Sequence, residues 1–175
     1  MASITFEDDC LAPDTQIVIR YKGPNPFKAY QKLVSFMREI WEVEAVAYWE
    51  REFRWDASSD PHEFVAKSYV SRGIDAFSRV IIEVFMQGLQ PSDPNKEGTV
   101  EIRIGGRLIT RFGGGSIFED ARNPLYKAFI WFYIKFFYQK QRQYYLKEWC
   151  YNRLQRLKKA YQELLNIKPS IESQV

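Results

Sequence analysis

The stretch PLYKAFIWFYIKFFYQKQRQYYLKEWCYNRLQRLKKAYQELLNIK, residues 124–168, has no glycine and no proline after its first residue. Asn123-Pro124 is a favoured helix start, because proline lacks the N–H group that a first helical turn leaves unpaired. Lys168-Pro169 is the expected end. The stretch therefore predicts one helix, which at ~1.5 Å per residue is roughly 65 Å long, about twice the diameter of a small domain. We expect it to overhang its own domain or to meet a partner.

The predicted helix is apolar almost all round over residues 125–138 and amphipathic beyond them. One face of its first half consists of Leu125, Phe129, Phe132 and Phe136. We expect this face to cover a sheet. The helix is also basic, with ten Lys or Arg against two Glu in residues 124–168, whereas residues 1–123 hold 15 basic and 19 acidic side chains. A mildly acidic body therefore carries a basic, aromatic helix.

The chain before this helix mixes period-two and helical patterns. The expected strands are residues 16–21, 43–55, 64–74, 77–88 and 99–112, and the expected short helix is residues 26–42. Gly105-Gly106 divides the last strand and permits either a hairpin or a bend. The apolar residues on both sides of the pair fall on even positions, so one continuous strand keeps them on one face and a two-residue hairpin does not. We favour one strand bent at the glycines.

These elements predict an α+β fold, in which a very long C-terminal helix grips a curved antiparallel β-sheet that carries one short helix. Residues 1–15 are expected to form an acidic N-terminal tail. Residues 16–123 form the sheet with its first helix, and residues 124–168 the long basic aromatic helix of the same domain.

This order of elements resembles the START-like helical-grip superfamily, of the polyketide cyclase and lipid-transfer type, over residues 16–150. The resemblance rests on element order, with no shared motif. The sequence differs in having fewer predicted strands, one helix where two are typical, and a longer terminal helix. The resemblance implies a pocket for an apolar ligand between sheet and terminal helix, and it implies no catalytic residues.

The apolar faces of strands and helix are the first candidate site, that of a non-catalytic protein that binds an apolar small molecule. The expected lining residues are Trp49, Phe53, Trp55, Val80, Ile82, Val84, Met86, Phe129, Phe132 and Phe136. The alternative is that these bulky side chains fill the core and leave no cavity.

The terminal helix is the second candidate, because cations bind phosphates and rings stack on bases in RNA- or ribosome-associated proteins. The candidate cations are Lys140, Lys147, Arg153, Arg156, Lys158 and Lys159. A solvated helix that is basic by composition explains the same residues, and an anionic membrane would also attract it. Apolar side chains left over after one face has covered the sheet predict a homo-oligomer, so a self-associating structural or assembly subunit is a further possibility.

Catalytic and metal-binding motifs are absent from the sequence. A single His62 in a polar loop and no nucleophile motif predict a protein that is not an enzyme and has no metal and no cofactor. Cys10 and Cys150 form no C-x-x-C pair, so we expect neither a zinc site nor a disulfide, and a reducing cytoplasm as the location. Residues 125–138 are too short to cross a bilayer and contain two lysines, so no transmembrane segment is expected.

Overall fold

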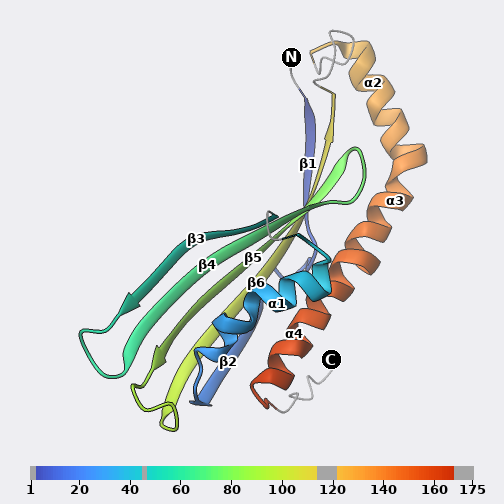
Figure 1. The fold of residues 1–175 in the computed structure, drawn as a ribbon. Helices are drawn as coiled ribbons and strands as arrows, with labels where there is room; N and C mark the ends of the chain where they lie inside the picture. Colours follow the sequence, from blue (N-terminus) through green and yellow to red (C-terminus); the bar gives the residue numbers. More distant parts are fainter. Residues whose placement is uncertain (1–2, 45–46, 114–121, 168–175) are drawn as a thin grey trace.

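The computed structural model of the chain describes residues 3–44, 47–113 and 122–167. Six antiparallel strands form one curved sheet, and the helices lie on one of its faces (Figure 1). The strands are β1 (Ile4–Asp9), β2 (Ile17–Pro24), β3 (Tyr48–Asp56), β4 (His62–Gly73), β5 (Ser78–Gln90) and β6 (Glu97–Phe112). The short helix is α1 (Lys28–Trp41). This arrangement confirms the predicted α+β fold class.

A continuous terminal helix runs from Pro124 to Leu164. Its segments are α2 (Pro124–Tyr133), the π-helical turn η3 (Ile134–Tyr138), α3 (Gln139–Tyr144), the π-helical turn η4 (Tyr145–Cys150) and α4 (Tyr151–Leu164). The side chain of Asn123 caps its start by accepting a hydrogen bond from the backbone N–H of Leu125. The helix ends before the predicted residue 168, since Asn166 adopts a positive φ of 52° that an α-helix does not continue through.

Strand β6 organises the sheet. On one side it pairs with β5 along most of its length, and on the other side it pairs first with β2 and then with β1. The β2 ladder ends at the pair Ile17–Ile104, and the β1 ladder begins at the pair Asp9–Arg107. Gly105 and Gly106 lie between the two ladders within one unbroken strand, as the even-position pattern predicts.

The predicted N-terminal tail is wrong for residues 4–9, which form strand β1. Each of these residues has a partner on β6, from Ile4 opposite Phe112 to Asp9 opposite Arg107. The burial of residues along β1 alternates only weakly, because acidic residues occupy much of the strand. The acidic composition hid a strand that is held by main-chain pairing and by cross-strand ion pairs such as that of Glu7 with Arg107, at 2.7 Å.

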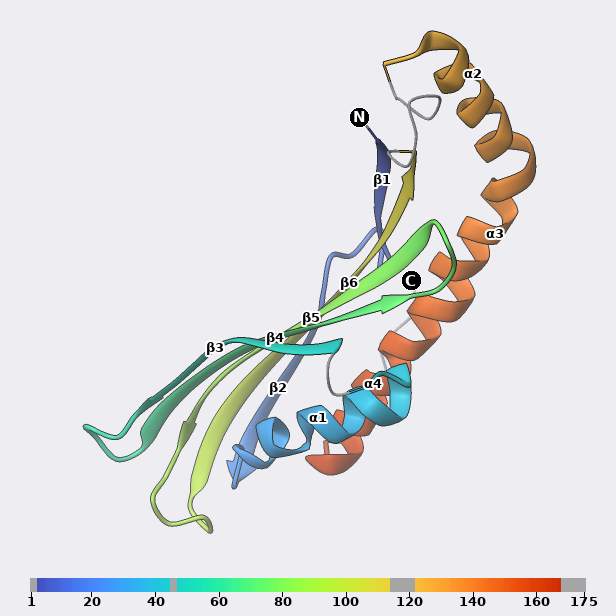
Figure 2. The ribbon, with the colours of Figure 1, turned by 45° about the horizontal axis from the view of Figure 1, so that its top comes forward.

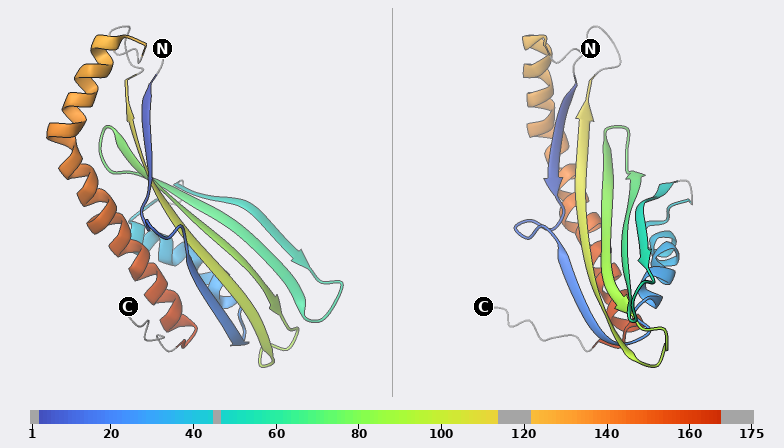
Figure 3. Two further views of the ribbon diagram at one scale, coloured as in Figure 1. Left: turned by 180° about the vertical axis from the view of Figure 1, so that it is seen from behind. Right: turned by 90° about the vertical axis from the view of Figure 1, so that its left-hand side faces the viewer.

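The core lies between the sheet and the two helices, on the face we call inner. In the right-hand view of Figure 3 the sheet faces the viewer and both helices lie behind it. The largest buried helix side chains are Leu33, Met37 and Trp41 from α1 and Leu154 and Tyr161 from α4. The helices also contact each other, with the ring centroids of Phe36 and Tyr161 5.1 Å apart.

The terminal helix lies directly on the backbone of β6 at Gly106. A Cβ atom added there would lie 2.9 Å from Cδ1 of Leu154 and 3.1 Å from Cδ1 of Ile82. Leu154 and Ile82 are themselves fully buried, so neither can move aside without displacing other core atoms. The glycine at this position therefore sets how closely the helix approaches the sheet.

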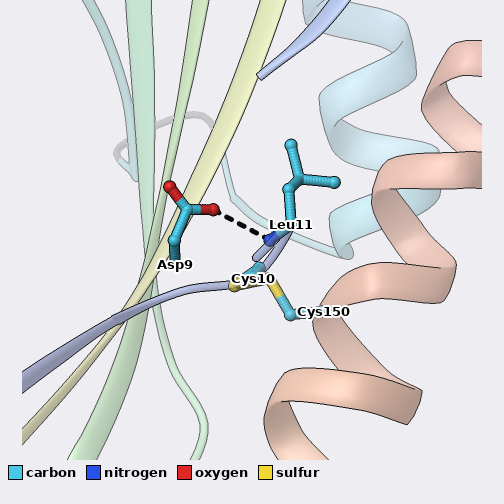
Figure 4. Close-up of a disulfide and its surroundings, with 4 residues drawn as sticks. All are labelled: Asp9, Cys10, Leu11 and Cys150. Atoms are coloured by element: carbon cyan, nitrogen blue, oxygen red, sulfur yellow. Dashed lines mark hydrogen bonds between the residues drawn. A yellow bond between two sulfur atoms is a disulfide. The ribbon is translucent and has the colours of Figure 1, made fainter. Parts of the chain in front are cut away.

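A disulfide joins Cys10, the residue after β1, to Cys150 in η4 (Figure 4). Beside it the carboxylate of Asp9 accepts a hydrogen bond from the backbone N–H of Leu11, at 2.8 Å. The sequence predicted no disulfide, and that prediction is wrong because 140 residues separate two cysteines that the fold brings together. Disulfides persist in oxidising compartments, so the two cysteines no longer support a cytoplasmic location.

The paired glycines provide a first test. Gly106→Val should lower the free energy of unfolding by about 1–3 kcal/mol through overpacking. Gly105→Val should change it little, because the only atom near an added Cβ there, among the described residues, is the Thr15 carbonyl oxygen at 3.6 Å. Urea unfolding of both variants measures the difference, and equal effects would contradict the close approach of helix and sheet.

The disulfide provides a second test. In protein prepared under oxidising conditions, replacing Cys10 and Cys150 together by serine should lower the free energy of unfolding by about 4 kcal/mol, because the bond closes a long loop in the unfolded chain. Reduction should destabilise the native protein similarly and leave the double variant unchanged. Two reactive thiols in the unsubstituted protein, unfolded without a reducing agent, would show that the bond does not form.

Candidate functional site

The strand residues predicted to line an apolar pocket lie on the inner face beneath the helices. Val80, Ile82, Val84 and Met86 are each exposed by 2% or less. The close contact between Gly106 and Leu154 shows that helix and sheet touch here with no space between them. At these positions a filled core, which was the alternative expectation from the sequence, describes the structure better than a cavity does.

The aromatic residues of β3 divide between the two faces. Phe53 and Trp55 pair with Ala66 and Phe64 and lie on the inner face. A bulge between Glu50 and Glu52 inserts one extra residue, which shifts the alternation of the strand. Trp49 consequently lies on the outer face, where its ring stacks on that of Tyr69 at 6.2 Å. The sequence placed all three aromatic residues on one face and did not detect the bulge.

The helix residues predicted to close the pocket point away from the sheet. We call Leu125, Phe129, Phe132 and Phe136 the apolar stripe. Their side chains are exposed by 79, 65, 49 and 62%, respectively. The expectation that this face covers the sheet is therefore wrong, and the structure does not bring the predicted lining residues together.

The opposite side of the same segment contacts the sheet through Tyr133 and Tyr138. Both rings pack on Phe112 of β6, at centroid distances of 6.3 and 5.4 Å. Residues five apart on an α-helix point about 140° apart. The π-helical turn η3 adds one residue to a turn and so directs both tyrosines toward the same strand.

A polar anchor holds this part of the helix to the hairpin between β4 and β5. The Tyr138 hydroxyl donates to the Asp75 carboxylate at 2.7 Å and lies 2.6 Å from the Ser78 hydroxyl, which in turn lies 2.9 Å from that of Thr110. The other oxygen of Asp75 accepts the backbone N–H groups of Phe77 and Ser78. The anchor therefore fixes both the hairpin and the rotation of the helix.

The anchor changes the ionisation of both groups that form it. Burial raises the pKa of the Tyr138 hydroxyl well above its usual value. Burial also acts to raise the pKa of Asp75, but the hydrogen bonds from Tyr138 and from the backbone of Phe77 and Ser78 outweigh it and lower that pKa. The tyrosine therefore stays protonated and the aspartate charged, which suits a structural hydrogen bond and gives no general base near neutral pH.

The apolar stripe lies on the part of the helix that extends beside β1 and the end of β6, far from α1 (Figure 2). We call this part, α2 and η3, the overhang. Two more exposed rings flank the stripe, Trp131 at 60% and Phe137 at 67%. Phe132 and Phe136 contact each other with ring centroids 4.6 Å apart, so the exposed rings form a continuous surface. Exposed apolar patches often mark interaction surfaces, so the overhang is a candidate for one.

The charged residues of the helix segment that carries the stripe are all positive. Residues 124–147 contain Lys127, Lys135, Lys140, Arg142 and Lys147 and no acidic residue. Arg142 pairs with Asp8 of β1 and lies over the ring of Phe6. The four lysines are exposed, and the ammonium of Lys135 lies 4.7 Å from the ring centroid of Trp131. Within the described residues none of the four forms an ion pair.

The cations predicted to bind RNA do not form one surface with these rings. Arg153, Arg156, Lys158 and Lys159 lie on α4, at the other end of the helix from the stripe (Figure 1). The guanidinium of Arg153 is already engaged, since it pairs with Glu42 at 3.2 Å and lies 4.3 Å from the ring centroid of Trp149. Lys140 in α3 and Lys147 in η4 lie between the overhang and α4 along the helix.

The sequence identified the four residues of the stripe as one helix face but assigned them the wrong environment. A signal in the sequence distinguishes the two sides. The sheet-facing side carries tyrosines, whose hydroxyls can find hydrogen-bond partners such as Asp75, whereas the stripe consists of Leu and Phe, which have no hydroxyl. The anchor itself depends on a contact between residues 63 positions apart and has no local signature.

Comparison of the chain with models of protein families, with curated proteins and with solved structures finds no match. The resemblance to START-like proteins therefore stays a prediction. In the part of the chain that the structure describes, no helix is sufficiently long and apolar to span a membrane. The same part contains no group of three or more His, Cys, Asp or Glu side chains placed to hold a metal ion.

The anchor generates a third test. Tyr138→Phe should lower the free energy of unfolding by about 1–2 kcal/mol, because it removes hydrogen bonds to Asp75 and Ser78. Since Asp75 has a lowered pKa when folded, its contribution is present above the unfolded value of about 3.9 and is lost as the pH falls through the folded value. The stability difference between native and variant protein, measured by urea unfolding, should therefore shrink below about pH 4. A difference independent of pH would contradict the role of Asp75.

Proposed function

We propose that the protein is a non-catalytic peripheral binding protein whose overhang docks on an anionic lipid surface. The observation that carries the proposal is the exposed apolar stripe next to lysines that form no ion pair with any described residue. A helix with Leu and aromatic residues on one side and Lys or Arg beside them lies in the plane of a membrane interface, with its apolar side chains among the headgroups and upper acyl chains.

The two parts of the overhang would contribute in different ways. Each lysine near an anionic leaflet contributes about 1 kcal/mol of attraction, which salt screens. Fully burying an exposed Phe or Leu side chain contributes roughly 1.5–3 kcal/mol. The side chains of the stripe are largely but not fully exposed, so each would gain part of this free energy on entering the bilayer. Tryptophan is enriched at membrane interfaces, and Trp131 lies beside Lys135 at this surface.

The structure supports a lipid surface more than the other occupants. Bases stack on rings that lie among phosphate-binding cations, whereas here the rings of Phe132 and Phe136 contact each other and most of the predicted RNA-binding cations lie on α4. A second copy paired along the overhang would bring positive side chains together, because residues 124–147 have no acid. An apolar ligand under the helix has no space at Gly106.

Vesicle flotation tests the proposal. The native protein should float with vesicles that contain phosphatidylglycerol and remain behind with phosphatidylcholine alone, because the lysines need an anionic partner. Phe129→Ser with Phe136→Ser should weaken binding at least tenfold, since two rings of the stripe are lost. Trp49→Ser is the matched control, because Trp49 is exposed by 55% but lies on the outer face of the sheet, and it should bind as the native protein does.

The competing functions predict other results. Co-purifying RNA that salt releases, with no flotation, would favour RNA binding. A concentration-dependent dimer that the double Phe variant abolishes, again with no flotation, would favour a self-associating subunit. Either result, or equal loss of flotation in the Trp49 control, would overturn the proposal.

A further inference from the structure

A second surface lies on the outer face of the sheet, opposite the helices (Figure 3). A groove of about 530 Å³ lies there over β6 at Gly105, and we call it the outer groove. Its main walls are Lys67, Ile81, Phe85, Arg103 and Arg107. Thr15 and Gln16, from the connection between β1 and β2, also line it. The volume lies within the range of small-molecule binding sites.

The floor of the groove is a glycine that packing does not require. A Cβ built on Gly105 has one described atom within 4 Å, the Thr15 carbonyl oxygen at an ordinary contact distance of 3.6 Å. Gly105 also has no positive φ, the conformation that would favour glycine. The neighbouring Gly106, in contrast, lies tightly under Leu154. The missing side chain at Gly105 thus keeps the outer groove open.

The groove contains a cation, Lys67, that has no partner among the described residues. Lys67 is partly buried on β4, and within the described residues its ammonium forms no ion pair or hydrogen bond. Its cross-strand neighbour Glu52 pairs instead with Arg54, at 2.8 Å. On its other side Lys67 lies opposite Phe85 of β5, so an apolar ring adjoins the free charge.

The remaining charges of the groove are engaged. Arg103 pairs with Glu101 at 2.6 Å, and Arg107 pairs with Glu83 at 3.0 Å. The carboxylate of Asp9 accepts the backbone N–H of Leu11. A partly buried ionised group is stabilised by a partner, and Lys67 is the lining cation that lacks one among the described residues.

We propose that the outer groove binds a small organic carboxylate that carries an apolar ring. The carboxylate accepts hydrogen bonds from the Lys67 ammonium, and the ring lies over Gly105 against the side chain of Phe85, next to the ion pair of Glu83 with Arg107. This site is on the opposite face of the sheet from the pocket that the sequence predicts, and it does not depend on docking of the overhang to lipid.

Titration with 1-naphthoate, followed by ¹⁵N amide spectra, tests this proposal. The amides of Lys67, Phe85 and Gly105 should shift. Lys67→Met keeps the aliphatic stem and should weaken binding about tenfold or more, since it removes a charge-assisted hydrogen bond. Gly105→Leu should abolish binding by filling the floor. Lys22→Met, a change at an exposed lysine that pairs with Glu97, is the control and should bind naphthoate as the native protein does.

Further measurements distinguish this site from unspecific binding. The uncharged 2-naphthol should bind the native protein more weakly than 1-naphthoate does. Because it has no carboxylate, 2-naphthol should bind Lys67→Met and the native protein with equal affinity. Unchanged chemical shifts outside the groove in each variant's own spectrum confirm that it folds. Shifts confined to Phe129, Phe132 and Phe136 would overturn the proposal, as would no shifts at all. Native affinity in Lys67→Met or in Gly105→Leu would overturn it too.

Discussion

The contact of the terminal helix with the backbone of β6 at Gly106 is the constraint on which the rest of the structure depends. Because Leu154 and Ile82 both approach a residue without a side chain, α4 packs closely against the sheet. The same contact brings Cys150 to within reach of Cys10. The helix is thereby held at one end, and its remaining length has to extend past the region that α1 and α4 cover.

The two π-helical turns determine which side of this extended helix meets the sheet. Tyr145 and Cys150 are five residues apart and yet both buried, and Tyr133, five residues before the buried Tyr138, is partly buried against the core. Each π turn accommodates one extra residue and so corrects the drift of a regular helix relative to the strand below it. With the tyrosines facing the sheet, the stripe around Phe129 has to face away from it. The exposed surface is therefore a geometric consequence of how the helix is anchored.

The sequence predicts the elements of this fold well, because element type depends on local periodicity. The even positions around Gly105 and Gly106 identify one long strand, and Pro124 correctly starts the terminal helix. The features that the sequence did not predict depend on contacts between distant residues. The bulge that moves Trp49 to the outer face and the disulfide of Cys10 have no signature within a few residues. The environment of the stripe was not predictable from helical spacing alone, since a helix that is apolar all round gives no direction.

These features separate a side of the terminal helix that contacts the sheet from an exposed side that we propose meets lipid. Spin labels at single positions from 125 to 136, in oxidised protein bound to phosphatidylglycerol vesicles, test this directly through their accessibility to oxygen dissolved in the bilayer. If the stripe enters the bilayer, accessibility should be highest at Leu125, Phe129, Phe132 and Phe136 and lowest at Tyr126, Ile130 and Tyr133. Uniform accessibility along the segment, or maxima on the tyrosine side, would contradict it.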